Sequence, residues 1–188
     1  MKTALICLAL ASLTVPARAD VDLSPTKSEL DETKYTILFF ADGGKEISYR
    51  VPKDWTYAKS GPEKIKFTPP GPSQAQCEIA VEPLTQPFAF DEEGITKLKE
   101  KARSLVPRDA EQVEFTGEQS NAVMIGGHEA HEVTLSFVLF GQPFKMAVLF
   151  ANIAPQQMRF RTIAHRDAFD AVHTTFRSSL CSWQWLEK

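Results

Sequence analysis

Residues 128–180 read HEAHEVTLSFVLFGQPFKMAVLFANIAPQQMRFRTIAHRDAFDAVHTTFRSSL, and this stretch decides the fold. Bulky and smaller or polar side chains alternate over 131–139, with the period of two that is typical of a strand. Two further strands follow over 144–153 and 158–164, joined by short turns. Over 169–180 the apolar residues recur at helical spacing. The stretch therefore predicts three antiparallel strands followed by an amphipathic helix.

The chain before this stretch predicts a hairpin, two strands and a helix, in that order. Asp42-Gly43-Gly44 is a turn signal between two strand-like runs, and Pro52 ends the second run. Asp91 has the position of an N-cap, with two acidic residues after it and apolar residues at helical spacing up to about Leu105. The remaining predicted strands are 64–68, 76–82, 112–117 and 122–125.

These elements predict an α+β fold built as a three-layer α/β/α sandwich. Short turns between neighbouring strands favour a mainly antiparallel sheet. The strand over 144–153 is apolar on both faces, so each face of the sheet needs a cover. One predicted helix is available for each face, and we therefore expect helices on both faces.

The first nineteen residues predict an export signal. Lys2 supplies a positive end, residues 4–15 form an apolar run, and Ala17-Arg18-Ala19 is a cleavage site before Asp20. The run is well short of the roughly 20 residues that a membrane-spanning helix needs, and no later segment approaches that length without charges. We expect a periplasmic or extracellular protein with no transmembrane segment after signal removal, in which residues 20–34 form a flexible lead-in and 35–188 a single domain.

The charge of the mature chain argues against a nucleic-acid partner. Removal of Lys2 and Arg18 leaves 19 basic residues against 24 acidic residues in 169 residues, a formal net charge of −5. Binding to phosphate backbones requires a basic face.

Two cysteines, Cys77 and Cys181, remain after signal removal. An even number of cysteines in an oxidising compartment permits one disulfide, and the alternative is two free thiols that pack as small apolar residues. The sequence leaves both interpretations open.

The order of the elements resembles the PsbP-like superfamily, which includes the extrinsic protein of photosystem II, a Ran-binding import factor and bacterial envelope proteins. The residues that carry the resemblance are the strand ending in Pro52-Lys53-Asp54-Trp55, the segment 125–130 (IGGHEA) and the final helix with Ser182-Trp183 after it. The resemblance covers about 35–183. It implies an α/β/α sandwich that binds other proteins or assists assembly, usually without enzymatic activity, and it implies no cofactor.

Four histidine and tryptophan positions, together with His173, are candidates for a site. His128 and His131 could ligate a metal, but they lie three apart in a predicted strand rather than four apart on a helix, so they should point to opposite sides. His173 lies on the apolar stripe of the last helix, which is typical of a core histidine. Trp183 and Trp185 lie in the C-terminal tail, where they either complete the core or contact a protein partner.

No catalytic constellation is apparent in the sequence. We therefore expect a non-enzymatic exported binding or assembly module, with another envelope protein or a small ligand as its partner. The alternative is a small metal-dependent or thiol-dependent enzyme.

Overall fold

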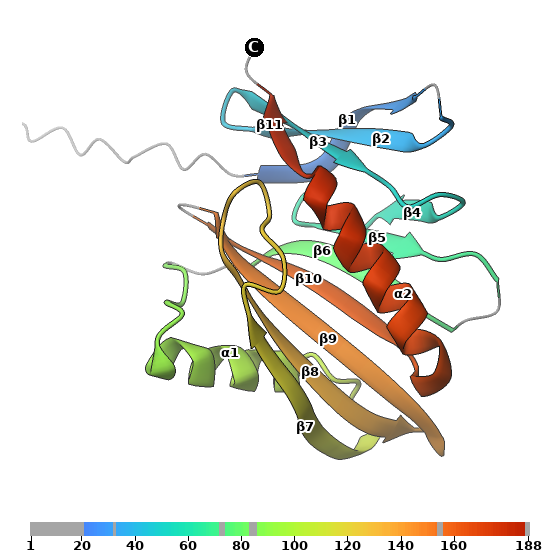
Figure 1. Ribbon diagram of the computed structural model, residues 1–188, viewed down its shortest axis with the longest axis vertical. Helices are drawn as coiled ribbons and strands as arrows, with labels where there is room; N and C mark the ends of the chain where they lie inside the picture. Colours follow the sequence, from blue (N-terminus) through green and yellow to red (C-terminus); the bar gives the residue numbers. More distant parts are fainter. Residues whose placement is uncertain (1–20, 32, 72–73, 83–85, 154–155, 187–188) are drawn as a thin grey trace, which may run out of the picture.

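Two antiparallel β-sheets and two helices make up the part of the chain that the computed structural model describes, which is residues 21–31, 33–71, 74–82, 86–153 and 156–186 (Figure 1). The small sheet has the strand order β1-β2-β3-β11 and the large sheet the order β4-β5-β6-β10-β9-β8-β7. The small sheet consists of β1 (Val21–Leu30), β2 (Thr36–Asp42), β3 (Lys45–Arg50) and β11 (Gln184–Leu186). The large sheet consists of β4 (Thr56–Lys59), β5 (Lys64–Thr68), β6 (Gln76–Glu82), β7 (Ala110–Ser120), β8 (Ala130–Leu139), β9 (Gln142–Ile153) and β10 (Gln156–His165). The helices are α1 (Glu92–Ser104), α2 (Arg166–Ser179) and the short 3₁₀ helix η1 (Leu180–Ser182).

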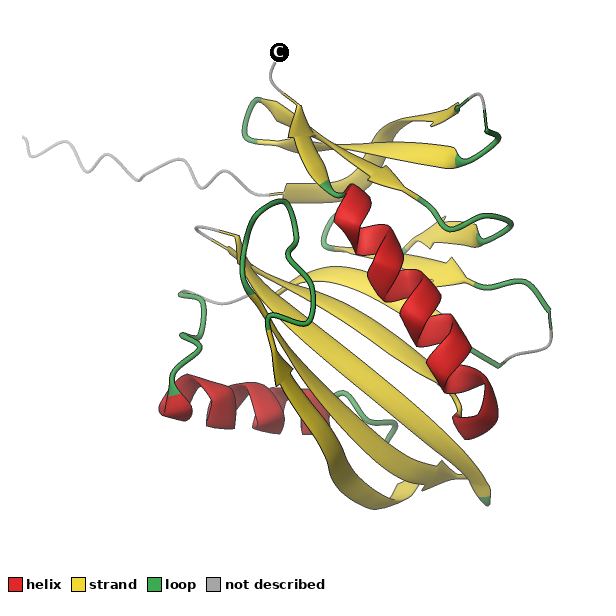
Figure 2. Ribbon diagram, in the orientation of Figure 1, coloured by secondary structure: helices red, strands yellow, loops and turns green. Residues whose placement is uncertain are grey.

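The predicted three-layer α/β/α sandwich is wrong. Strands account for 55% of the described residues, in two sheets, and these residues form only two α-helices. The hairpin β2–β3, which we expected in the same sheet as β8, β9 and β10, instead pairs with β1 and β11 in a separate sheet (Figure 2). Alternation along a strand specifies which side chains point inward, but it does not specify which strands pair.

The N-terminal part of the chain also differs from the sequence prediction. Residues 21–30, expected in a flexible lead-in, form β1, which pairs with β2 across a β-bulge between Asp22 and Lys27. Val21 and Leu23 are buried in the main core. The predicted export signal lies outside the described residues. Among the described helices, none is long and apolar enough to cross a membrane.

Two hydrophobic cores lie on opposite faces of the large sheet. Side chains alternate along β9, so Leu149 joins the main core while Val148 joins a second core. The main core is shared by the large sheet, the small sheet and α2, and it includes Phe40, Tyr49, Phe176 and Trp183. The second core lies between the large sheet and α1, where Leu98 and Ala102 are buried against Val133, Leu135 and Met146.

The structure confirms the predicted N-cap of α1 and the predicted apolar stripe of α2. The Asp91 carboxylate accepts a hydrogen bond from the Gly94 N–H at 2.8 Å, which confirms Asp91 as the N-cap of α1. Phe169, Val172 and Phe176 form the buried stripe of α2. After α2 the chain continues through η1 into β11, which pairs with β3. The last turns of α2 therefore lie beside the end of β3.

Candidate functional site

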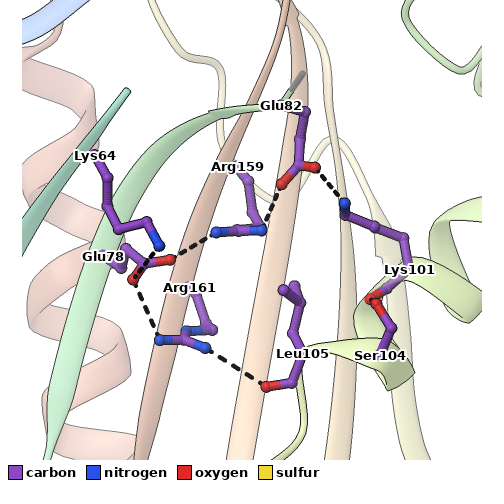
Figure 3. Close-up of polar contacts among 8 residues, drawn as sticks. All are labelled: Lys64, Glu78, Glu82, Lys101, Ser104, Leu105, Arg159 and Arg161. Atoms are coloured by element: carbon purple, nitrogen blue, oxygen red, sulfur yellow. Dashed lines mark hydrogen bonds and ion pairs between the residues drawn. The ribbon is translucent and has the colours of Figure 1, made fainter. Parts of the chain in front are cut away.

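Three deeply buried charged side chains lie together on the α1 side of the large sheet (Figure 3). Arg159 of β10 bridges two glutamates of β6, with its Nη2 2.6 Å from Glu78 Oε1 and its Nη1 2.5 Å from Glu82 Oε1. All three residues are at least 94% buried. A buried carboxylate is retained in its charged form only when cations of this kind pair with it.

Three further cations complete this buried ion cluster. Lys101 Nζ of α1 lies 2.6 Å from Glu82 Oε2, and Lys64 and Arg161 approach Glu78 Oε2 at 3.9 and 3.3 Å. Burial lowers the pKa of Arg161, against the opposing effect of Glu78. Arg161 also donates to the carbonyl oxygen of Leu105, just after α1. The cluster therefore ties α1 to β6 and β10, which is a structural role.

His128 and His131, the two candidate metal ligands, lie in different surroundings. His128 lies in the loop before β8, where its ring contacts the Trp185 ring edge-on at 5.4 Å. His131 is buried on the α1 side, with its Nδ1 3.2 Å from Ser120 Oγ and its ring beside Phe90. Burial lowers the pKa of His131. Among the described residues, no three His, Cys, Asp or Glu side chains gather as a metal site.

A hydrogen-bonded row of side chains joins β6, β10, α2 and β8 on the α2 side of the sheet. Cys77 Sγ donates to Thr162 Oγ1 at 3.6 Å, and Thr162 Oγ1 lies 3.3 Å from His173 Nδ1. His173 Nε2 lies 3.2 Å from Glu132 Oε2, and Arg177 also approaches this carboxylate. His173 is therefore a partnered histidine at the edge of the core. Burial raises the pKa of the Cys77 thiol to about 12, so it is not a ready nucleophile.

The two cysteines of the candidate disulfide are free thiols in the structure. Cys77 is buried in the main core, whereas Cys181 is exposed in η1. The structure therefore gives no support to their pairing.

The two C-terminal tryptophans have different surroundings. Trp183 is 1% exposed and its ring stacks on Phe40 at 5.7 Å. Trp185 is partly buried, and its Nε1 donates to Asp42 Oδ2 at 2.9 Å. Trp183 is thus placed in the main core. Trp185 is hydrogen-bonded to the end of β2 and contacts His128 in the loop before β8, so it does not stand free at the surface.

A groove runs between the end of β3, the connection of β1 to β2 and the last turns of α2. Its volume is about 810 Å³. It is lined by Thr33, Tyr35, Arg50, Val51, Pro52, Lys53, Thr174, Thr175, Ser178, Ser179, Cys181 and Ser182. This volume is within the range of roughly 300–1,000 Å³ that is typical of ligand sites.

Local structure gives the groove its polar lining. Pro52 ends β3 and sends the chain away from the small sheet, while the partly buried Trp55 stacks on Phe176 of α2 at 6.2 Å. The exposed side of α2 consequently faces the end of β3, and it carries Thr174, Thr175 and Ser178. The Arg50 N–H donates to Ser182 Oγ at 2.8 Å, which fixes η1 beside β3.

The sequence reasoning missed this groove. The serines at 178, 179 and 182 read as ordinary residues of a helix end, and Arg50 as the exposed position of a strand. The sequence does contain a sign of the groove. Hydroxyl residues recur at three- and four-residue spacing from Thr174 to Ser182, on the side of the helix opposite the apolar stripe. The pattern alone does not indicate that β3 faces it.

Comparison with known proteins gives structural neighbours only. The chain matches no protein family model and no curated protein. Its structure is similar to the solution structure of cyanobacterial PsbP (CyanoP) from Synechocystis sp. PCC 6803, with a TM-score of 0.52 and 10% identity, covering 94% of this chain and 99% of that one. It is also similar to LpqN of Mycobacterium tuberculosis, a protein involved in cell envelope biogenesis, with a TM-score of 0.50 and 14% identity, covering 75% of this chain and 83% of that one. The resemblance drawn from the sequence is confirmed at the level of the fold, and this chain has a PsbP-like fold.

Proposed function

We propose that this chain is an exported, non-enzymatic binding module of the cell envelope that holds a partner protein in the groove between β3 and α2. The observation that carries the proposal is the groove itself, whose lining offers hydroxyls and cations from three separate parts of the chain. Two observations support it: one structural neighbour is an envelope protein, and residues 1–19 have the pattern that predicts an export signal.

The state of the cysteines favours binding over thiol chemistry. A thiol enzyme requires a thiolate near neutral pH, held beside a base. Cys77 has a histidine within its hydrogen-bonded row, but Thr162 lies between them and burial raises the pKa of the thiol to about 12. Cys181 is exposed and lines the groove, which makes it a reporter for occupancy of the groove.

Site-directed crosslinking tests the proposal. A photo-crosslinker with a thiol-reactive end is attached to Cys181 in native mature protein, where Cys77 is buried and unreactive. The labelled protein is returned to an envelope fraction of its source organism and illuminated. We expect one discrete adduct, and we expect mass spectrometry to identify the same partner in repeated preparations.

The matched control carries the crosslinker elsewhere on the surface. In a Cys181→Ser, Phe140→Cys variant the label stands on the turn between β8 and β9, where Phe140 is 82% exposed. We expect no adduct from this position. Absence of an adduct at Cys181, or an identical adduct from both positions, contradicts binding in the groove.

A further inference from the structure

We propose that the occupant of the groove is an extended polypeptide segment with an acidic side chain, whose carboxylate pairs with Arg50. This inference rests on the proposed function and specifies the chemistry of the partner. It follows from three features of the groove: its continuation past Arg50, its charge, and the single aromatic ring in its lining, which has Arg50 over one face.

The groove continues around the edge of β3 onto the outer face of the small sheet. A second hollow of about 290 Å³ is lined by Ile37, Ser48, Arg50, Ser182 and Gln184. It shares Arg50 and Ser182 with the groove beside α2. Arg50 therefore stands between two hollows that follow one another. Such a shape fits an extended chain better than a compact molecule.

The charge of this surface is opposite to that of the whole protein. The mature chain has a formal net charge of −5 after signal removal, yet the charged residues lining the two hollows are Arg50 and Lys53. Within the described part of the chain, no carboxylate is paired with Lys53. An anionic group on the ligand therefore finds complementary charge here, and an arginine binds a carboxylate through two parallel hydrogen bonds.

One carboxylate competes for Arg50. Asp31 Oδ2 lies 3.3 Å from Arg50 Nη2. The Asp31 carboxylate also accepts hydrogen bonds from the Tyr35 N–H and from the hydroxyl and N–H of Thr33, and these bonds lower its pKa. Asp31 is thus held in its own turn, and Arg50, whose side chain is 52% exposed, retains donors for a ligand.

The lining favours a peptide over a glycan. Sugar rings bind by stacking on aromatic faces, and Tyr35 is the single aromatic residue in the two linings. The Arg50 guanidinium lies over one face of the Tyr35 ring, at 5.4 Å from its centroid, and competes with a sugar ring for that face. The hydroxyls of Ser48, Thr174 and Ser178 can both donate and accept, which suits the alternating N–H and C=O groups of an extended peptide.

The surroundings of the second hollow limit where the acidic residue of the ligand can lie. Ile37 pairs in register with Glu29 of β1, and Ser48 lies two residues from Glu46 on β3. Both glutamates contact Lys27, at 3.4 and 3.7 Å. A carboxylate carried beyond Arg50 toward β1 would therefore approach acidic residues. We expect one preferred acidic position, at Arg50, rather than a general preference for negative charge.

Selection from a random octapeptide phage library on immobilised mature protein tests the inference. We expect recovered peptides to share an Asp or Glu at one position. For a synthetic fluorescein-labelled peptide, replacing that residue by Asn or Gln should raise the Kd on the order of tenfold in fluorescence anisotropy. Saturating peptide should also slow the reaction of Cys181 with a thiol reagent.

Three variants locate the effect. Arg50→Ala should raise the Kd on the order of tenfold. Asp31→Asn keeps an acceptor oxygen for the turn but removes the competing charge, and it should lower the Kd a few-fold, so the inference remains testable if Arg50→Ala fails to fold. Lys59→Gln removes one positive charge from β4, outside the lining, and should leave the Kd unchanged.

The outcomes separate this inference from the proposed function. A crosslinked partner at Cys181, together with selected peptides that share no acidic position, overturns the acidic peptide and leaves the binding module intact. Equal Kd values for wild type and Arg50→Ala, or binding of an acidic polysaccharide or of anionic phospholipid vesicles in place of peptides, also overturn it. Failure of both the crosslinking and the selection overturns the proposed function itself.

Discussion

Gly126 shows how closely the C-terminal strand is fitted to the rest of the molecule. A Cβ added at this residue would lie 1.8 Å from Cζ3 of Trp185, well inside van der Waals contact. Its backbone φ of +54° is also one that glycine adopts with little strain. The absence of a side chain at Gly126 therefore allows Trp185 to reach Asp42 and close the small sheet.

Gly126→Ala should destabilise the protein by about 2–3 kcal/mol, because the indole of Trp185 must move and the backbone is strained. Gly127→Ala is the matched control, since its φ is +86° but its added Cβ would meet nothing within 4 Å. The free energy of unfolding of Gly127→Ala should fall by only about 1 kcal/mol, through backbone strain. Urea unfolding followed by tryptophan fluorescence measures both, and equal losses would contradict the contact with Trp185.

Arg159 offers a second prediction for a single residue, because two carboxylates depend on it. Arg159→Met leaves Glu78 and Glu82 in a buried position without the cation between them. Breaking a buried ion pair on one side typically costs about 3–5 kcal/mol, and we expect a loss of this size in urea unfolding.

An exposed basic residue provides the comparison for Arg159. Arg103→Met on α1 should change the free energy of unfolding by less than about 0.5 kcal/mol. The double variant Arg159→Met, Glu82→Gln should be more stable than Arg159→Met alone, because it has one unpaired buried charge fewer. A loss for Arg159→Met no larger than for Arg103→Met would mean that the remaining cations, Lys64, Lys101 and Arg161, suffice for both glutamates.

The sequence predicted the burial of apolar residues more reliably than the role of the polar ones. Phe169, Val172 and Phe176 fall at helical spacing, and each is buried. Glu78 and Arg159 occupy the alternate positions of β6 and β10, which would face solvent in a sheet covered on one side only. They are buried because α1 covers this face, and that depends on contacts distant in sequence.

At the scale of elements, the start of α1 is fixed from outside the helix. Gly94 is buried in the first turn, and a Cβ there would lie 1.9 Å from the carbonyl oxygen of Ala89. The segment before the helix therefore folds back over its first turn. This close approach, rather than helix propensity, requires glycine at this position.

Gly94→Ala should destabilise the protein by about 1–3 kcal/mol. In a helix without this contact the same change would stabilise it by roughly 1 kcal/mol, so the sign of the effect is diagnostic. Thr96→Ala, at an exposed position of the same helix, should change stability by less than about 0.5 kcal/mol. Thermal or urea unfolding measures both, and a stabilised Gly94→Ala variant would contradict the contact with Ala89.

Elements were predictable where local signals were strong. The N-cap Asp91, the turn Asp42-Gly43-Gly44 and the long strands β8, β9 and β10 follow from their sequences. β1 was missed because its outward side chains are polar and its periodicity is broken by the bulge between Asp22 and Lys27. β11 was missed because three residues are too few to show a period.

At the scale of the whole molecule, the sequence could not show that the chain forms two sheets. The small sheet has β1 and β11 as its two edge strands, and it is complete only when β11, near the C-terminus, pairs with β3, which is the strand pairing most distant in sequence among the described residues. The second hollow, which continues the groove, is a product of the same pairing, since Ser182 and Gln184 come from the C-terminal end and Ile37 and Arg50 from the β2–β3 hairpin. Its residues become a site only after both ends of the chain have met.

The two thiols provide a test of this architecture. Cys77 lies in the main core, which the large sheet, the small sheet and α2 build together, whereas Cys181 is exposed. Burial raises the pKa of Cys77 to about 12, so it should react with a disulfide reagent at pH 8 only when the molecule opens. In native mature protein, we expect the exposed thiol of Cys181 to react at once.

The thiol of Cys77 should react more slowly, at a rate set by the global free energy of unfolding. This is because exposing Cys77 requires the two sheets to separate. Gly126→Ala, which loosens the attachment of β11, should accelerate the reaction of Cys77 in proportion to its loss of stability, and Gly127→Ala should do so less. Counting thiols over time by absorbance, with peptide mapping, assigns each reaction to its cysteine. Two thiols that titrate at once would contradict the burial of Cys77, and a linked Cys77–Cys181 peptide under non-reducing conditions would restore the disulfide that the sequence permits.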